Sequence, residues 1–332
     1  SAQSRTAPGG ARRGEVRTMS EVEEMMVEGK PGGREELEEA LAEEEFTEHE
    51  EIEESRPEET KEPESEEAAG LEIQEAPEPS YFKLRIACAK ELANLLKAAA
   101  ILVDEPAIII TEGGLRIRSM DPSRIAMVDL FIGRSVFDEY EVDGGESTIC
   151  VSLPDLLRFL RKVKKGESAE LALDEATGRV RLTLRGKYTR SFTIPRLEFA
   201  SEVPSELKLA LTAKALLDAG ELRKAIEEVG LMGDFVKFTV DNEGLTLSAE
   251  GYDRSARIEF SRACDAMIDL EVKEPATATY DAGYLAKIHK AGTALADVVE
   301  VELATNKPLR LAFRLPYEAT LVYWLAPRVE RE

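Results

Sequence analysis

One pattern of residues occurs twice in this chain and constrains its fold more than any other feature of the sequence. Leu115–Leu130 holds two runs in which apolar and polar residues alternate, with Met120–Ser123 between them. A period of two is typical of a strand with one buried face, and Asp, Pro and Ser favour a turn. The pattern returns about 130 residues later, through the matches Gly114 with Gly244, Leu115 with Leu245, Ile117 with Leu247, Arg124 with Arg254, Ala126 with Ala256, Val128 with Ile258 and Leu130 with Phe260. We therefore expect the folded part to be one unit written twice.

Helices and strands are expected in the same order in both copies. Apolar residues at i, i+3, i+4 and i+7 predict helices at Ala89–Ala100, Pro154–Lys165 (ended by Gly166), Ala219–Val229 and Ala282–Lys290. Alternating runs predict further strands at Tyr81–Ala87, Val103–Thr111, Glu170–Asp174, Arg179–Arg185, Tyr188–Ile194, Leu207–Leu211, Val236–Val240, Leu245–Ala249, Arg254–Phe260, Met267–Val272, Val298–Ala304, Leu309–Leu315 and Ala319–Leu325. Short turns favour antiparallel pairing. The sequence thus predicts an α+β fold of two tandem similar domains, 81–194 and 206–332, joined by a proline-bracketed connector at 195–205, with helices on one face of antiparallel sheets.

The first 80 residues differ from the rest in composition. They hold 26 acidic and 8 basic residues, whereas the remainder holds 40 acidic and 35 basic residues. They are rich in Glu, Pro, Ser and Gly and cannot bury enough apolar surface to offset the entropy of ordering. We expect a disordered tail, in which Glu35–Glu45 could form a transient helix. An acidic interaction arm, a solvated tail and a mis-chosen translation start are all open interpretations, and we favour the last two.

Rare residue types indicate the cellular setting. The three cysteines, Cys88, Cys150 and Cys264, are odd in number and far apart, which argues for a reducing compartment without a disulfide framework. No apolar run reaches the length that spans a membrane, and the beginning of the chain lacks the apolar core of a secretory signal. The expected location is cytoplasmic, without membrane contact.

The sequence contains no recognisable catalytic constellation. The motifs G-x-x-x-x-G-K-[ST], G-x-S-x-G, H-E-x-x-H and C-x-x-C do not occur. His289 is the one histidine outside the tail, and its position between Lys287 and Lys290 predicts a surface residue. We expect no enzymatic activity, no cofactor and no metal.

All four expected helices carry basic residues away from their apolar stripes. The second helix is the most basic, because no acidic residue lies between Leu156 and Lys165. The candidate DNA-binding set is Lys90, Lys97, Arg158, Arg161, Lys162, Lys165, Arg223, Lys224, Lys287 and Lys290. Such side chains attract phosphates without reading base sequence. Solvated surface is the default interpretation of any single basic face, but four of them in repeated positions favour nucleic acid.

Three stretches resemble a known family: LRIRSMDPSRIAMVDL at 115–130, MGD at 232–234 and YWLAPRVE at 323–330. The chain from Tyr81 onward resembles the sliding clamps of the proliferating cell nuclear antigen (PCNA) type found in archaea and eukaryotes. The resemblance implies a DNA-clamp fold in which two-domain subunits close head to tail into a ring of three, either a homotrimer or a heterotrimer. Helices would line a channel around double-stranded DNA, and sheets would form the outside.

The resemblance also implies partners and their binding site. A clamp of this family is a processivity factor in DNA replication and repair, tethers DNA polymerase, DNA ligase and flap endonuclease, and is opened by a clamp loader. Partners insert a short PCNA-interacting peptide into an apolar pocket. The pocket positions correspond here to Met120, Ile125, Met127, Val203, Pro204, Pro308, Trp324, Ala326, Pro327 and Val329. Ring closure would join the edge strands at about Lys187–Ile194 and Arg254–Phe260.

Two other functions remain as alternatives. A duplicated saddle that grips DNA from one side would need apolar wedges on a DNA-facing sheet, whereas the basic residues here lie on helices. A two-lobed α+β enzyme would need the catalytic motifs that this sequence lacks.

Overall fold

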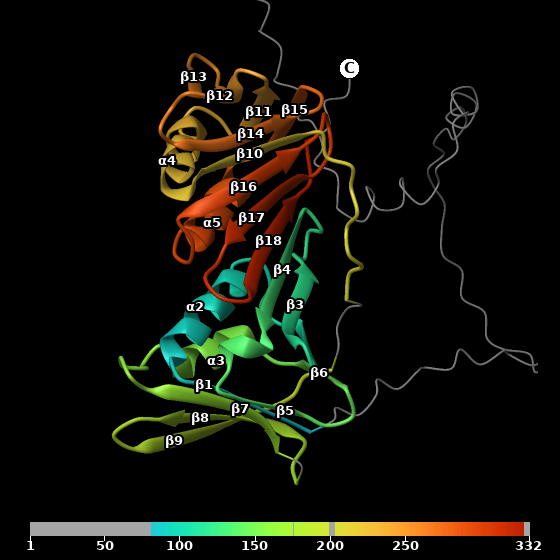
Figure 1. Cartoon of the computed structure of the whole chain (residues 1–332), viewed down its shortest axis with the longest axis vertical. Coiled ribbons are helices and arrows are strands. Elements are labelled where there is room, and N and C mark those ends of the chain that lie inside the picture. Colours follow the sequence, from blue (N-terminus) through green and yellow to red (C-terminus); the bar gives the residue numbers. More distant parts are fainter. Residues whose placement is uncertain (1–80, 175, 199–202, 329–332) are drawn as a thin grey trace, which may run out of the picture.

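A nine-stranded antiparallel sheet contains strands from both halves of the chain and lies at the centre of the molecule (Figure 1). The computed structural model describes residues 81–174, 176–198 and 203–328. The predicted tail at 1–80 therefore lies outside the described residues, as does part of the connector. A five-stranded sheet and a four-stranded sheet flank the long sheet at its two ends.

Both halves contain the same succession of elements, which confirms the predicted duplication. The first half consists of β1 (Phe82–Ile86), α2 (Ala89–Ala100), β2 (Ala107–Thr111), β3 (Gly114–Met120), β4 (Ala126–Gly133), the short 3-10 turn η1 (Arg134–Val136), β5 (Glu139–Val142), β6 (Glu146–Cys150), α3 (Leu153–Leu160), β7 (Ser168–Asp174), β8 (Arg179–Arg185) and β9 (Thr189–Ile194). The second half consists of β10 (Ala213–Asp218), α4 (Ala219–Gly230), β11 (Phe235–Asp241), β12 (Gly244–Glu250), β13 (Ser255–Ser261), β14 (Met267–Val272), β15 (Ala276–Asp281), α5 (Ala282–Gly292), β16 (Val298–Leu303), β17 (Leu309–Arg314) and β18 (Ala319–Leu325).

The long sheet joins the two halves at β4 and β18. Its strand order is β14-β10-β16-β17-β18-β4-β3-β2-β6. The last strand of the chain, β18, therefore pairs with β4 of the β3–β4 hairpin in the first half. The other two sheets have the orders β5-β1-β7-β8-β9 and β13-β12-β11-β15. Strands β9 and β13 therefore lie at sheet edges.

The repeated hairpins β3–β4 and β12–β13 share one unusual contact. Gly114 has a φ of +153° and a Cβ there would lie 2.3 Å from the Ile132 carbonyl oxygen, while Gly244 has a φ of +159° and a Cβ there would lie 2.1 Å from the Phe260 carbonyl oxygen. Only glycine allows the partner strand to approach so closely. Ile132 is thus the structural equivalent of Phe260. The sequence match of Leu130 with Phe260 was wrong by two residues, because the second hairpin has a shorter turn.

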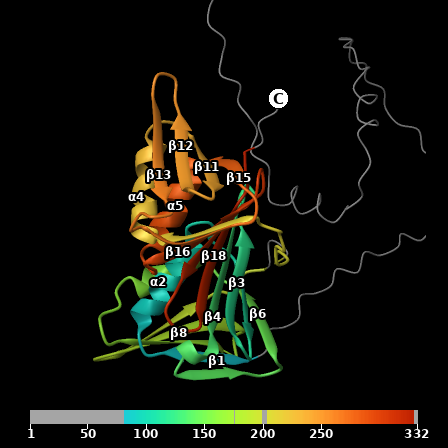
Figure 2. The ribbon, with the colours of Figure 1, turned by 45° about the horizontal axis from the view of Figure 1, so that its top comes forward.

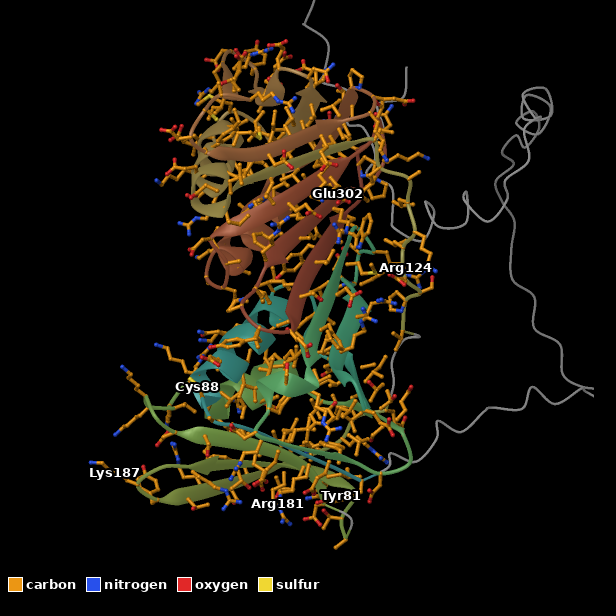
Figure 3. All side chains as sticks on the ribbon, in the orientation of Figure 1. Tyr81, Cys88, Arg124, Arg181, Lys187 and Glu302 are labelled. Carbon is orange, nitrogen blue, oxygen red and sulfur yellow. The ribbon has the colours of Figure 1, made fainter. Side chains whose placement is uncertain are left out.

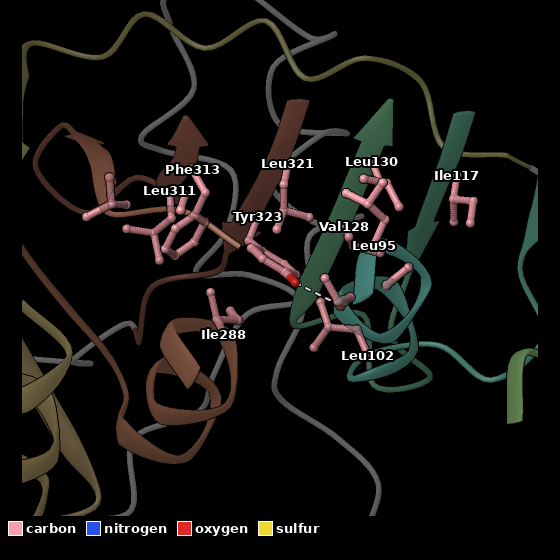
Figure 4. Packing of buried hydrophobic residues seen from close by; sticks show 14 of the residues in the cluster. Leu95, Leu102, Ile117, Val128, Leu130, Ile288, Leu311, Phe313, Leu321 and Tyr323 are labelled. Carbon is pink, nitrogen blue, oxygen red and sulfur yellow. Dashed lines mark hydrogen bonds between the residues drawn. The ribbon is translucent and has the colours of Figure 1, made fainter. Parts of the chain in front are cut away.

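All four described helices pack on the same side of the sheets (Figures 1 and 2). Their buried stripes and the inward faces of the strands form one continuous apolar core. At the junction between the halves, the buried Tyr323 hydroxyl donates to the Ala98 carbonyl of α2 at 2.8 Å, among Leu95, Leu102 and Ile288 (Figure 4). The core therefore continues across the boundary between the two domains.

Several stretches of secondary structure differ from the sequence prediction. Leu207–Leu211 was predicted as a strand, but it forms no strand, and the first strand of the second half begins at Ala213. Strands β6 and β15 were not predicted, because their short runs of Thr, Ser and Ala give only a weak apolar pattern. Within the described part of the chain, no helix has the length and apolar character needed to cross a membrane.

Candidate functional site

The basic residues singled out in the sequence lie on the helical side of the molecule. All ten are solvent-exposed except Arg223, which is half-buried. Helix α2 shows why: Leu92, Leu95 and Leu96 are buried in the core, so Lys90 and Lys97 project from the opposite face. Both halves of the molecule therefore expose cationic side chains on the same side, on helix faces that point away from the core.

Helix α3 is shorter than the sequence predicted. It begins at Leu153, where the Ser152 hydroxyl accepts the Asp155 N–H, and ends at Leu160 rather than Lys165. The Glu167 carboxylate accepts the Lys164 N–H at 2.9 Å, which ends the helix by turning the chain back. Lys162 and Lys165 therefore lie in a turn after the helix, and the basic residues predicted for this helix, Arg158, Arg161, Lys162 and Lys165, do not form one continuous helical face.

Helix α4 pairs its cations with its own acidic residues. Lys224 Nζ lies 2.7 Å from Glu221, and Arg223 Nε lies 2.9 Å from Glu227. The hydrogen bond that Lys224 donates to the Glu221 carboxylate raises the pKa of Lys224. Because α4 holds three acidic residues, Glu221, Glu227 and Glu228, and only these two basic ones, it offers no net positive charge to an anion.

Helix α5 exposes Lys287 and Lys290 but buries His289 completely. The prediction of a surface histidine was wrong, because His289 packs edge-on against the Phe313 ring with the centroids 5.7 Å apart. Within the described structure neither of its ring nitrogens has a hydrogen-bond partner. Burial lowers the pKa of His289 to about 3, so the ring is neutral and plays no part in the basic surface.

Four of the predicted pocket residues form a small apolar cluster that is separate from the main core. Met127, Trp324 and Ala326 are buried in it, and Met120 packs against them. Trp324 on β18 is paired across the strands with Met127 on β4. Residues far apart in the sequence meet here because the final strand, β18, lies beside β4 of the β3–β4 hairpin.

The other predicted pocket residues lie outside this cluster. Ile125 packs against the main core, and its carbonyl accepts the Ala326 N–H at 2.8 Å. Pro308 and Pro327 are buried, whereas Val203 is exposed and Pro204 half-buried. Val329 lies outside the described residues.

Leu207, Leu209 and Leu211 also pack against the cluster, as Val322 does, and the sequence did not predict these contacts. They pack against it from the segment that enters the second half. Their alternation predicts a strand, although it also suits an extended segment with one face packed on an apolar surface.

Asp121 organises the turn between the two methionines of the cluster. Its carboxylate accepts the N–H groups of Ile125 at 2.7 Å, Ala126 at 2.6 Å and Ser123 at 3.0 Å. It also accepts the Tyr284 hydroxyl of α5 at 2.7 Å. The Lys287 ammonium in turn lies over the Tyr284 ring, 5.6 Å from its centroid. A chain of contacts thus connects the cluster with the basic helical side.

The described residues show no metal site. No group of three or more His, Cys, Asp or Glu side chains among them is arranged to hold a metal ion. Cys150 is buried, and burial raises the pKa of its thiol. Among the described residues, the features that could contact other molecules include the basic helices, the apolar cluster and unpaired edge strands such as β9, which follows Lys187 (Figure 3).

Comparison with family models matches two adjacent parts of the chain. Residues 81–198 match the N-terminal domain of proliferating cell nuclear antigen, and residues 210–328 match its C-terminal domain. A DNA polymerase sliding clamp of Pyrobaculum aerophilum is 35% identical over 243 residues, which cover 73% of this chain and 96% of that relative. One of Pyrococcus abyssi is 32% identical over 250 residues, covering 75% and 99%.

Solved structures agree with these matches. The PCNA of Thermococcus kodakaraensis superposes with a TM-score of 0.69 at 26% identity, covering 74% of this chain and all of that one. A chain of the PCNA2–PCNA3 complex of Sulfolobus tokodaii superposes with a TM-score of 0.67 at 28% identity, covering 75% and 100%. With both family domains matched in order on a two-domain α+β clamp fold, this chain belongs to the proliferating cell nuclear antigen family of DNA polymerase sliding clamps.

Proposed function

We propose that this protein is a DNA polymerase sliding clamp subunit that encircles double-stranded DNA and tethers replication and repair enzymes to it. The observation that carries the proposal is the placement of basic residues on the helical side of a clamp fold. Phosphate contacts from Lys and Arg hold DNA without reading its sequence. A ring that closes around the duplex can therefore remain attached while it slides.

The apolar cluster of Met120, Met127, Trp324 and Ala326 is the proposed docking site for partner peptides. Aromatic and aliphatic anchors bind most strongly where they fill desolvated apolar surface. DNA polymerase, DNA ligase, flap endonuclease and the clamp loader are the expected partners. Leu207 and Leu209 lie against the same cluster, so an incoming anchor would pack against them as well.

Ring closure is proposed to use two of the unpaired sheet edges, β9 and β13. Strands β9 and β13 end their sheets, and an unpaired edge can accept a strand from another chain. We further propose that 81–194 and 206–332 are the two clamp domains, that 195–205 connects them, and that the protein has no catalytic activity of its own. The partner subunits are either copies of this chain or different clamp chains.

DNA binding by α5 can be tested with matched lysine substitutions. The variant Lys287→Ala/Lys290→Ala removes two charges from the helical side, while Lys237→Ala/Lys307→Ala removes two exposed charges elsewhere on the described surface. We expect the first variant alone to lower polymerase processivity on primed circular DNA and to reduce the salt dependence of DNA binding. Equal behaviour of the two variants would contradict the proposed DNA-facing side.

A further inference from the structure

Most cations on the strands are paired with an acidic neighbour, whereas those on α2 and α5 are not. Lys83 and Arg85 of β1 both pair with Glu139 of β5, at 3.1 and 3.0 Å. Comparable ion pairs hold Arg116, Arg118, Arg181, Arg185, Arg190, Lys214, Arg257, Arg310 and Arg314. Among the described residues no ion pair holds the exposed Lys90, Lys97, Lys287 and Lys290. Helices α2 and α5 therefore present cations that can bind an anion.

The helices also differ in sign from the rest of the fold. Helices α2, α3, α4 and α5, together with the turn 161–166, hold eleven basic and five acidic residues. The remainder of 81–332 holds 24 basic and 35 acidic residues. A polyanion is therefore attracted to the helical side and repelled by the rest of the surface.

The chain contains such a polyanion in its own first 80 residues. The stretch 35–67 includes 18 glutamates and only two basic residues, Arg56 and Lys61. Thirteen residues, 68–80, separate it from Tyr81, which directly precedes β1 (Figure 3). Thirteen extended residues span about 43–47 Å, whereas the eight steps from Tyr81 to the start of α2 at Ala89 span at most about 29 Å. The stretch is therefore long enough to reach the helices of its own subunit.

We infer that the stretch 35–67, called here the acidic arm, binds to the exposed cations of α2, α3 and α5 and competes there with DNA. The inference rests on the DNA-facing helical side of the proposed function, to which it adds an occupant from the chain itself. Of the interpretations that the sequence leaves open for the first 80 residues, it selects the acidic interaction arm. The reason is that the fold supplies the unpaired cations that such an arm needs.

The attachment of the arm to the fold sets the strength of this competition. A segment attached through a short linker is present at an effective concentration on the order of 1 mM. An arm that binds with a dissociation constant of about 0.25 mM is then bound about four times as often as it is free, and it weakens DNA binding about fivefold. Duplex DNA carries one charge per about 1.7 Å and displaces the arm once the proposed ring encloses it. The arm therefore weakens brief contacts with DNA more than it affects a closed ring.

Neutralisation of the acidic arm tests the inference on the full-length chain. All 18 glutamates of 35–67 are replaced by glutamine, which keeps the length of the chain. We expect this variant to bind a labelled duplex of about 30 base pairs about fivefold more tightly than the wild type at about 50 mM salt, measured by fluorescence anisotropy. At about 300 mM salt the difference should fall below about twofold, because salt screens exposed charges. Equal affinities of the two proteins at low salt would overturn the inference.

A second pair of variants locates the contact on the fold. One removes four helix cations, Lys90→Ala, Lys97→Ala, Lys287→Ala and Lys290→Ala, and the matched control removes four exposed lysines off the helices, Lys208→Ala, Lys237→Ala, Lys273→Ala and Lys307→Ala. Neutralisation of the arm should improve DNA binding about fivefold in the control but less than about twofold in the helix variant. A fivefold gain in both would show that the arm repels DNA through its net charge without occupying the helix cations, and the inference would be wrong.

A titration without DNA separates failure of the inference from failure of the proposed function. A labelled peptide of residues 35–67 is added to the full-length chain with the neutralised arm, and we expect a dissociation constant of about 0.25 mM that rises with salt. If the peptide binds but the helix variant and its control bind DNA equally, the proposed DNA-facing side is contradicted and the arm contact stands. If DNA binding requires the helix lysines but no peptide binds at about 2 mM, only the arm contact is contradicted.

Discussion

The Tyr284 hydroxyl of α5 donates a hydrogen bond to the Asp121 carboxylate at 2.7 Å, and this bond connects the second domain with the turn that carries Met120 and Met127. Burial and the neighbouring Asp121 raise the pKa of Tyr284 to about 12. The hydroxyl therefore remains protonated and able to donate throughout the neutral pH range. The cluster proposed to bind partner peptides is thus held in part from the helical side of the molecule.

Removal of that hydroxyl should weaken peptide binding. A single hydrogen bond to a charged acceptor contributes about 1.5–3 kcal/mol. The loss should be smaller than this here, because the Asp121 carboxylate still accepts hydrogen bonds from three backbone N–H groups. We expect Tyr284→Phe to raise the dissociation constant of a labelled PCNA-interacting peptide by about fivefold. Tyr140→Phe removes a hydroxyl that donates to the Thr111 carbonyl at 2.7 Å and is the control. Equal affinities for Tyr284→Phe and the wild type would show that the turn holds without it.

Substitution of two residues of the proposed pocket should have a larger effect on the same measurement. Removal of buried anchor contacts costs about 2 kcal/mol or more, which is roughly a thirtyfold loss of affinity. We expect Met127→Ala/Pro327→Ala to abolish stimulation of polymerase, ligase and nuclease without loss of assembly. Met267→Ala, a buried methionine of the main core, controls for a general loss of packing. Unchanged peptide affinity would remove these residues from the pocket.

Buried His289 should make the fold sensitive to acid. Its pKa is about 3 in the native protein and about 6.5 in an unfolded chain. Below about pH 6.5 the unfolded chain therefore binds a proton that the native protein does not, and native stability falls as the pH is lowered towards 3. The free energy of unfolding of wild type relative to His289→Leu should fall by about 2 kcal/mol between pH 7 and pH 4.5. Parallel pH profiles for the two proteins would contradict the burial of a neutral histidine.

The close approach at Gly114 should tolerate no side chain. A Cβ there would meet the Ile132 carbonyl oxygen at 2.3 Å, so Gly114→Ala must push two strands of the long sheet apart. We expect a loss of about 3 kcal/mol in the free energy of unfolding. Gly145 has a φ of +86° but no atom within 4 Å of an added Cβ. Gly145→Ala should therefore lower the free energy of unfolding by only about 1 kcal/mol. Chemical denaturation of both variants gives the comparison, and similar losses would contradict the steric explanation.

The first 80 residues should contribute nothing to the stability of the clamp fold. Their composition cannot support a core, and both family domains match from residue 81 onward. A chain that begins at Ser80 should melt within about 2 °C of the full chain by calorimetry. A large drop in melting temperature, or a loss of assembly, would show that these residues pack on the domains.

Local pattern was sufficient to predict much of the fold. Helix α2 begins and ends at the predicted Ala89 and Ala100, and β8 covers the predicted Arg179–Arg185, because apolar spacing is regular in both. The duplication could also be predicted, because each of the two hairpins requires a glycine, Gly114 or Gly244, where its partner strand approaches closely. The match between the two hairpins was wrong by two residues because it aligned Arg124 with Arg254, which lie in turns of different length. The equivalent positions in β4 and β13 are instead set by how each strand pairs with its neighbour.

Long-range contacts could not be predicted in the same way. The burial of His289 depends on Phe313, which lies on another element, so its basic neighbours in sequence gave the wrong expectation. The early end of α3 depends on Glu167 capturing the Lys164 N–H. Met127 and Trp324 could be grouped only through the family resemblance, and the contribution of Leu207, Leu209 and Leu211 became visible only with the packing itself.

A hinge between the two domains is ruled out by the sheet that runs through them. To bend there, the molecule would have to separate seven consecutive residue pairs of β4 and β18, pull Tyr323 away from Ala98 and split one continuous core. Each subunit should therefore behave as a single rigid arc. In the proposed ring, the strain that a clamp loader applies would concentrate at the contacts between subunits, where strand edges meet without a shared chain, so that one contact can open while every subunit keeps its shape.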